Sequence, residues 1–201
     1  MLAASFLAFN NAAHAEAGDW LIRARGIGVL PEANGTPTVI GGDVDIEDQF
    51  VPELDFTYFI SNNLAAELIL ATTPHDVSVS GSALGDVDLG SVWLLPPTLS
   101  LQYHFLPQQK IRPYAGIGLN YTIFYNVDNG PIATDIDYDD SFGWSLQAGA
   151  DFMINDRWSI NADVKKLFLS TSVDVKALGA TITSDVDIDP WIVGIGVGYH
   201  F

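Results

Sequence analysis

Large apolar positions alternate with small or polar ones at the carboxyl end of the chain. In residues 191–201 every second position holds a large apolar or aromatic residue: Trp191, Val193, Ile195, Val197, Tyr199 and Phe201. Such alternation over about ten residues, with aromatic residues at both ends, is typical of a membrane β-barrel strand that turns one face to lipid. We therefore predict that the chain ends in a lipid-facing strand. The alternative is an edge strand of a soluble β-sandwich.

Seven further segments show the same period-two pattern: residues 19–30, 49–60, 64–73, 95–105, 111–123, 141–152 and 158–170. In the first of these, Trp20 and Ile22 share one face while Arg23 and Arg25 lie on the other. Because arginine faces lipid only at high cost, the face with Trp20 is the outward one. Lys166 breaks the outward pattern of its segment, which predicts either a β-bulge or a lysine that snorkels to the interface. Eight strands form the smallest common membrane barrel.

The connections between these segments alternate in length. Short turns follow Ile60, Phe105 and Ile154, whereas residues 31–48, 74–93, 126–140 and 171–190 form long connections. Outer-membrane barrels have short periplasmic turns and long extracellular loops. We predict an all-β fold, an eight-stranded antiparallel transmembrane β-barrel with both termini in the periplasm. Residues 16–201 form this single domain.

The amino terminus has the features of a secretion signal. Residues 2–9 are apolar, and Ala13-His14-Ala15 gives the small-x-small pattern at which signal peptidase cuts. The basic region that normally precedes the apolar segment is absent, so we interpret residues 1–15 as a signal-peptide remnant; the alternative is a disordered apolar tail. Export together with a barrel predicts the bacterial outer membrane as the location, with its lipid and lipopolysaccharide as surroundings.

Composition narrows the classes of function. No stretch approaches the roughly 20 apolar residues of a spanning helix. The chain has no cysteine, which excludes disulfides and thiolate metal sites, and we expect no cofactor. Acidic residues number 25 against 8 basic ones, giving a net charge of −17, which argues against nucleic acid as a partner. His75, His104 and His200 show neither metal-helix nor Ser-His spacing, so we predict that the protein is not an enzyme.

Several short segments carry distinctive combinations of residues. They are Ala65-Ala66-Glu67-Leu68, Ala71-Thr72-Thr73-Pro74-His75-Asp76-Val77, Leu94-Leu95-Pro96-Pro97-Thr98, Gln102-Tyr103-His104-Phe105, the stretch from Arg112 to Thr122, and the Gly-x-Gly-Tyr-x-Phe ending. In these segments and in their order, the chain resembles the OmpW family of outer-membrane proteins over most of residues 16–201. The resemblance implies an eight-stranded barrel with a narrow hydrophobic lumen that passes or binds small hydrophobic molecules.

Inward positions on the periplasmic half of the predicted barrel are charged. The predicted charge network consists of Arg23, Arg25, Glu53, Asp55, Glu67, Arg112, Asp163 and Lys165. The interior of eight strands is only wide enough for side chains, so opposite charges should pair into a plug. We expect Arg23, Arg25 and Arg112 to neutralise Glu53, Asp55 and Glu67.

Inward positions on the extracellular half are apolar: Ile27, Val29, Val51, Ile69, Phe124, Leu167, Leu169 and Ile192. One interpretation is ordinary filling of a small barrel. The other is a pocket or uptake path for small hydrophobic solutes, because lipid already accepts the outer face and nothing requires an apolar interior. A solute above a charged floor needs another exit, and a lateral opening between strands supplies one. A third possibility is a structural or adhesive barrel whose acidic loops act as a surface receptor or contact lipopolysaccharide.

Two further motifs lead to predictions. Each long connection contains an Asp-x-Asp with an apolar middle residue, at 43–45, 86–88, 135–137 and 185–187. The carboxylates of each pair lie about 7 Å apart on an extended strand, so a solvated acidic rim is favoured over a specific metal site. Outer-membrane barrels commonly end in an aromatic residue, and we predict that Tyr199 and Phe201 form a signal read by the barrel-assembly machinery.

Overall fold

The computed structural model describes residues 16–32, 41–83, 85–131, 133–177 and 180–201, so the predicted signal segment lies outside it. Antiparallel strands make up its regular structure: β1 (Trp20–Leu30), β2 (Asp43–Ile46), β3 (Gln49–Phe59), β4 (Leu64–Ala71), β5 (Thr73–Ser82), β6 (Gly85–Leu95), β7 (Thr98–His104), β8 (Ile111–Asn129), β9 (Ala133–Tyr138), β10 (Ser141–Met153), β11 (Trp158–Phe168), β12 (Ser170–Ala177), β13 (Ala180–Asp187) and β14 (Trp191–His200). Among these residues no helix is long and apolar enough to cross a membrane.

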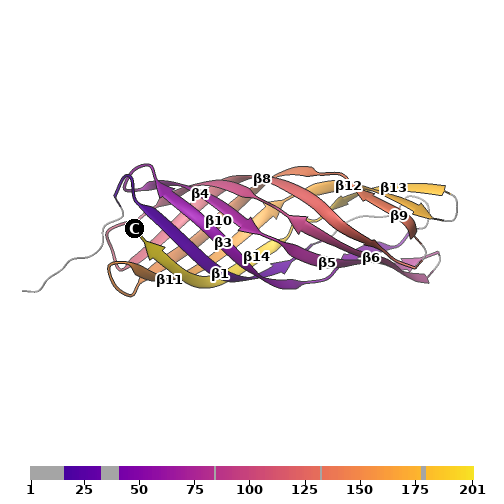
Figure 1. Cartoon of the computed structure of the whole chain (residues 1–201), viewed down its shortest axis with the longest axis horizontal. Helices are drawn as coiled ribbons and strands as arrows, with labels where there is room; N and C mark the ends of the chain where they lie inside the picture. The colour runs from indigo at the N-terminus through magenta and orange to yellow at the C-terminus, as the bar shows by residue number, and fades with distance from the viewer. Residues whose placement is uncertain (1–15, 33–40, 84, 132, 178–179) are drawn as a thin grey trace, which may run out of the picture.

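Eight of these strands close into a barrel. Its ring order is β1-β3-β4-β7-β8-β10-β11-β14, and β14 returns to pair with β1 from Leu21↔His200 to Leu30↔Trp191. The short turns and the carboxyl terminus lie together at one end, which we call the turn end (Figure 1). The predicted eight-stranded barrel with a terminal closing strand is confirmed, and the soluble sandwich is wrong.

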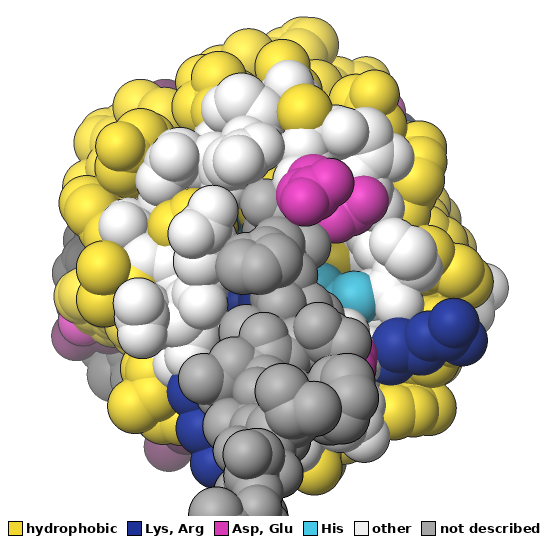
Figure 2. Space-filling model, turned by 90° about the vertical axis from the view of Figure 1, so that its left-hand side faces the viewer, with side chains coloured by type: hydrophobic (Ala, Val, Ile, Leu, Met, Phe, Trp, Pro, Cys, Tyr) yellow, Lys and Arg dark blue, Asp and Glu magenta, His cyan; other side chains and the backbone are white. Residues whose placement is uncertain are grey.

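The outer surface of the ring is apolar, as a lipid-facing wall requires. Leu119 and Phe142 are 73% and 81% exposed. Viewed along the axis from the turn end, hydrophobic side chains cover much of the circumference (Figure 2). Aromatic rings gather near the turn end, where Trp158 lies 4.9 Å from Tyr199 between ring centroids. This arrangement matches the aromatic girdle of a membrane interface.

Three of the four long connections are mostly strand, and the first, residues 31–48, contains the short strand β2. β2, β5, β6, β9, β12 and β13, which we call the extension, continue the barrel past the ring at the end opposite the turns (Figure 1). In β2, Asp43 and Asp45 are exposed while Val44 between them is buried. These segments therefore carry the same period-two alternation as the ring. The long connections at this end were predicted, but the strands within them were not, because aspartates take the place of lipid-facing residues once the strands have left the apolar band.

Lys166 causes no bulge. The β10–β11 ladder continues through it at Leu146↔Lys166, and the β11–β14 ladder reaches it in unbroken register at Lys166↔Trp191. Its ammonium lies 5.2 Å from the centre of the Trp191 ring and also contacts the Glu32 carboxylate. Of the two alternatives, the snorkelling lysine is the observed one.

Candidate ligand site in the lumen

The lower lumen is closed by buried ion pairs, which we call the charged floor. Arg23 lies within 3.0 Å of Asp55, 3.3 Å of Glu67 and 2.8 Å of Asp151, measured between nitrogen and oxygen atoms. The side chains of Arg23, Asp55 and Glu67 have no exposed surface. The pairing of Arg23 with Asp151 was not predicted.

A second group of pairs lies above the first. The Arg25 guanidinium is 2.7 Å from Glu53 and 2.9 Å from Asp55, and the Lys165 ammonium is 3.6 Å from the other Glu53 oxygen. Arg25 also lies 3.6 Å from Asp163. Charge-assisted contacts of this kind, with little exposed surface, fill the cross-section rather than line an aqueous pore.

Arg112 lies apart from the acids predicted to pair with it. Its Nε donates to the carbonyl oxygen of Gln109 at 3.2 Å, and its residue is opposite Asp151 in the β8–β10 ladder. Glu53, Asp55 and Glu67 instead contact Arg23, Arg25 and Lys165. The expected pairing of Arg112 was wrong because the axial stagger between strands, which inward parity does not reveal, leaves Arg112 closer to the turn end.

Glycines on the inner face of β14 make room for the arginines. A Cβ on Gly196 would lie 2.7 Å from Cγ of Arg25, and one on Gly198 would lie 3.4 Å from Cγ of Arg23. Gly196 therefore provides space for the Arg25 side chain of the neighbouring β1, and Gly198, where a Cβ would lie 2.6 Å from Oγ of Ser159, provides space for side chains of both neighbouring strands. The role of these glycines is steric.

Above the charged floor the lumen contains an apolar cavity of about 110 Å³. Seven of the eight predicted residues line it: Ile27, Val29, Ile69, Phe124, Leu167, Leu169 and Ile192. Val51 does not line it, but packs with Ile27, Val29 and Ile192 in a buried cluster beside it. A dry apolar cavity of roughly 150 Å³ in another protein binds benzene, so this space is of the right order for a small apolar group.

The extension contributes lining residues that the sequence analysis missed. They include Val44, Val77, Val79, Val92, Tyr138, Val173 and Val186. The apolar middle residue of each Asp-x-Asp motif, namely Val44, Val87, Ile136 or Val186, belongs to one buried cluster with Leu167 and Leu169. The cavity thus reaches from Glu53 and Lys165 at the charged floor into the extension. The period-two signal in the acidic segments could have revealed this.

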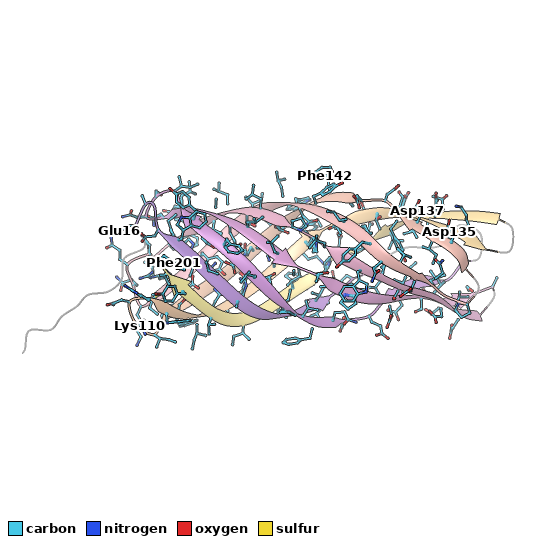
Figure 3. The ribbon with its side chains drawn as sticks, in the orientation of Figure 1. Glu16, Lys110, Asp135, Asp137, Phe142 and Phe201 are labelled. Atoms are coloured by element: carbon cyan, nitrogen blue, oxygen red, sulfur yellow. The ribbon has the colours of Figure 1, made fainter. Side chains whose placement is uncertain are left out.

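The aspartates of these motifs lie on the outside. Asp135 and Asp137 project from the extension, at the end opposite Lys110 and Phe201 (Figure 3). Among the described residues no group of three or more His, Asp or Glu side chains could hold a metal ion. The expected acidic surface is therefore an outer wall of the extension rather than a rim of loops.

His75 is a polar exception within the cavity lining. One ring nitrogen lies 3.0 Å from the Glu47 carbonyl oxygen, and the other lies 3.0 Å from the Thr73 hydroxyl. Burial lowers the pKa of His75, against the raising effects of Glu47, Asp76 and Asp48. A neutral, fully hydrogen-bonded imidazole is compatible with an apolar cavity.

The barrel wall beside the cavity lacks part of its hydrogen-bond ladder. The β4–β7 ladder ends at Ile69↔Thr98, and the β5–β6 ladder starts only at Thr73↔Leu94. Within the part of the chain that the structure describes, no ladder pair joins the residues between these two. Proline offers no N–H, so Pro96–Pro97 cannot donate across this stretch.

This interruption, which we call the wall gap, lies between the cavity and the lipid-facing surface. Ala71 and Pro96 line the cavity, whereas the neighbouring Leu70 is 38% exposed on the outer face. On the opposite side of the strand the wall stays closed, because the Tyr121 N–H donates to the Pro97 carbonyl at 3.2 Å. The gap therefore faces β4 and β5 alone.

Comparison with known proteins agrees with this architecture. The model of the OmpW family matches residues 16–201. A protein of Sinorhizobium fredii, named Uncharacterized outer-membrane protein y4mB, is 46% identical over 90% of this chain and 80% of its own length. The Dibenzothiophene metabolism operon protein PahQ of Pseudomonas aeruginosa is 30% identical over 81% of this chain and 77% of its own. The crystal structure of the outer membrane protein OprG from Pseudomonas aeruginosa superposes with a TM-score of 0.89 at 28% identity, covering 95% of this chain and 99% of that one.

Proposed function

The chain belongs to the OmpW family of outer-membrane barrel proteins, and from this premise we propose that it takes up small hydrophobic molecules through the upper lumen. The observation that carries the proposal is the apolar cavity, which continues from the membrane level into the extension. A purely structural barrel has no need of such a space, because lipid outside the wall already accepts its apolar residues. A solute that covers the cavity wall gains roughly 25 cal/mol per Å² of apolar surface removed from water.

The charged floor argues against passage straight into the periplasm. Arg23 and Arg25 are held by carboxylates with no water-exposed surface between them. Parting buried ion pairs of this kind costs roughly 3–5 kcal/mol for each broken pair. An apolar solute does not repay that cost, since it offers the stranded charges no partner.

We propose the wall gap as the exit. It adjoins the cavity at Ala71 and Pro96, and Leu70 beside it faces lipid. A solute that leaves here moves from one apolar environment into another without crossing the charged floor. Solutes would thus reach the hydrocarbon of the outer membrane from the cell surface.

A relative's name supports the substrate class. PahQ is named for an operon of dibenzothiophene metabolism, and dibenzothiophene is an apolar aromatic compound. That relative covers most of this chain, so the comparison concerns the barrel itself.

The test is entry of a fluorescent apolar probe into the bilayer of liposomes that contain the barrel. Ile69→Asp and Leu167→Asp place an unpaired charge in the cavity and should abolish probe entry. Leu68→Ala, at an outward residue that is 40% exposed, is the control and should behave as the parent does. If an Asp variant does not fold, Leu167→Trp fills the same space without a charge. Parental uptake by folded lumen variants would show that the lumen is not the path, and the structural or adhesive alternative would replace this one.

We also propose that each end of the barrel contacts a different partner. Lipopolysaccharide surrounds the outer wall of the extension, and the barrel-assembly machinery reads Tyr199 and Phe201. Phe201 is 67% exposed, with its ring centre 4.8 Å from that of Tyr199. Deletion of Phe201 should lower membrane insertion while leaving secretion intact.

A further inference from the structure

Two hydroxyl groups in the upper cavity form no hydrogen bond with any residue that the structure describes. Ser184 lines the cavity, and its Oγ is buried without a partner among the described residues. Tyr138 lines the same cavity, and no described residue forms a hydrogen bond with its hydroxyl. Nearby hydroxyls are satisfied; Thr171, for example, donates to the Asp139 carbonyl at 2.7 Å.

The strand register places these two side chains in one row. In the three-stranded sheet β13-β12-β9, Val173 is opposite Ser184 on one side and opposite Tyr138 on the other. Directly paired residues in a sheet point to the same face, and here all three line the cavity. The row therefore presents a hydroxyl at each side of an apolar valine.

The aromatic ring of Tyr138 is fixed by packing. It stacks on Phe124 with ring centroids 5.5 Å apart and an interplanar angle of 10°. Burial raises the pKa of Tyr138 to about 12, so its hydroxyl keeps its proton and remains a donor. The Ser184 hydroxyl, which is buried without a partner, is an uncommon feature, because such a group loses hydration and gains nothing in return.

Charged residues around the row limit which ligand groups can bind there. Asp137, Asp174 and Asp185, each adjacent in sequence to one member of the row, are exposed on the outer face of the same sheet. Lys176 is one basic residue there, and it is paired with Asp135 at 2.8 Å. The negative potential of this wall disfavours an anionic group at the row, whereas a neutral group is unaffected.

We propose that Tyr138 and Ser184 form a polar subsite that holds the neutral hydrogen-bonding group of a ligand whose apolar body fills the cavity below. This inference rests on the proposed function and names its substrate class. The preferred ligand is a neutral, largely apolar molecule with one polar group, such as a phenol, alcohol or ketone. A hydrocarbon without a polar group and a carboxylate are both disfavoured. The hydroxyls donate to or accept from its polar atom, and Phe124 with Tyr138 presents ring faces to its apolar part.

The test compares three probes that share one ring system and differ in their polar group: naphthalene, 2-naphthol and 2-naphthoate. Binding to the barrel in lipid nanodiscs is followed by fluorescence titration at pH 7, with empty nanodiscs to correct for partitioning. We expect 2-naphthol to bind about three- to tenfold more tightly than naphthalene, the range of one or two neutral hydrogen bonds, and 2-naphthoate to bind most weakly.

Conservative variants isolate the hydroxyls. Tyr138→Phe and Ser184→Ala should each lower 2-naphthol affinity about threefold and leave naphthalene affinity unchanged. Ser172→Ala is the matched control, because its hydroxyl donates to Asp185 at 2.7 Å on the outer side of the same sheet. Parental 2-naphthol binding by both variants would overturn the polar subsite while naphthalene binding still upheld the hydrophobic pocket. A parent that binds none of the three probes would overturn the proposed function as well.

Discussion

Arg23 and Asp151 lie 128 positions apart in the sequence and form a two-point ion pair across the lumen. Arg23 donates from Nε to one Asp151 oxygen at 3.0 Å and from its terminal nitrogen to the other at 2.8 Å. This geometry matches the planar fork of a guanidinium to the two oxygens of a carboxylate. The pair joins β1 to β10 across the barrel.

Removal of Arg23 should strongly destabilise the barrel. Arg23→Ala removes the guanidinium that contacts Asp55, Glu67 and Asp151 together. Loss of one partner from a buried ion pair lowers the free energy of unfolding by roughly 3–5 kcal/mol. The measurement is reversible unfolding by urea in lipid vesicles. Lys176→Ala is the control, because that pair with Asp135 is more than half exposed and should be close to neutral. Equal effects of the two variants would mean that water screens the charged floor.

The sequence predicted the ring of strands because lipid imposes alternation locally. Tyr58 and Leu119 face out whatever their strand pairs with, so parity alone assigns them. The pairs within the lumen depend on stagger instead. Arg112 and Glu67 share inward parity yet lie at different heights, and single-strand patterns carry no information on height.

The extension was missed for a different reason. Its outward residues face water, so Asp137 beside the inward Tyr138 resembles a loop composition although the backbone is a strand. The lining that the extension contributes, with the hydroxyls of Tyr138 and Ser184 in one row, followed only from the pairing of strands such as β9, β12 and β13. The part of the site that could not be predicted from the sequence therefore depends on pairing between strands that are distant in the chain.

Gly196 should resist even a small side chain. A Cβ there would lie 2.1 Å from the Ala24 carbonyl oxygen and 2.7 Å from Cα of Arg25, so Gly196→Ala must push the backbone of β1 away from β14. Overpacking of this kind costs roughly 1–3 kcal/mol. Thermal unfolding in detergent measures it. Gly28→Ala is the control, because its nearest contact would be an ordinary 3.6 Å to Val193. A Gly196→Ala barrel as heat-stable as the parent would show that the inner face of β14 is not tightly packed.

Acid should weaken the extension through His75. Burial lowers the folded-state pKa of this imidazole below its unfolded value of about 6.5, so the unfolded state binds the proton more readily. The stabilisation is present above the unfolded pKa and is lost as pH falls through the folded one. Unfolding free energy followed from pH 7.5 to 5 should decrease in the parent and decrease less in His75→Gln. Identical profiles for the two proteins would remove His75 from the acid response.

The wall gap can be tested by a variant that slows the exit of a solute from the cavity without changing how tightly the cavity binds it. Replacing both Pro96 and Pro97 with alanine removes both rings and supplies an N–H donor at residue 96 toward the stretch where the ladder between Ile69↔Thr98 and Thr73↔Leu94 is missing, whereas residue 97 faces β8, where its carbonyl already accepts from Tyr121. Completed pairing should close the wall. The double variant should bind an apolar probe with parental affinity and deliver it to the liposome bilayer several-fold more slowly.

Pro52→Ala is the matched control, since Pro52 lies on the exposed face of β3 within an unbroken ladder with β1. It should change neither binding nor delivery. Parental delivery by the double alanine variant would exclude the wall gap as the exit, because a solute held above the intact charged floor would then have to leave by another route. Loss of binding together with delivery would show instead that the prolines shape the cavity itself, which Pro96 lines.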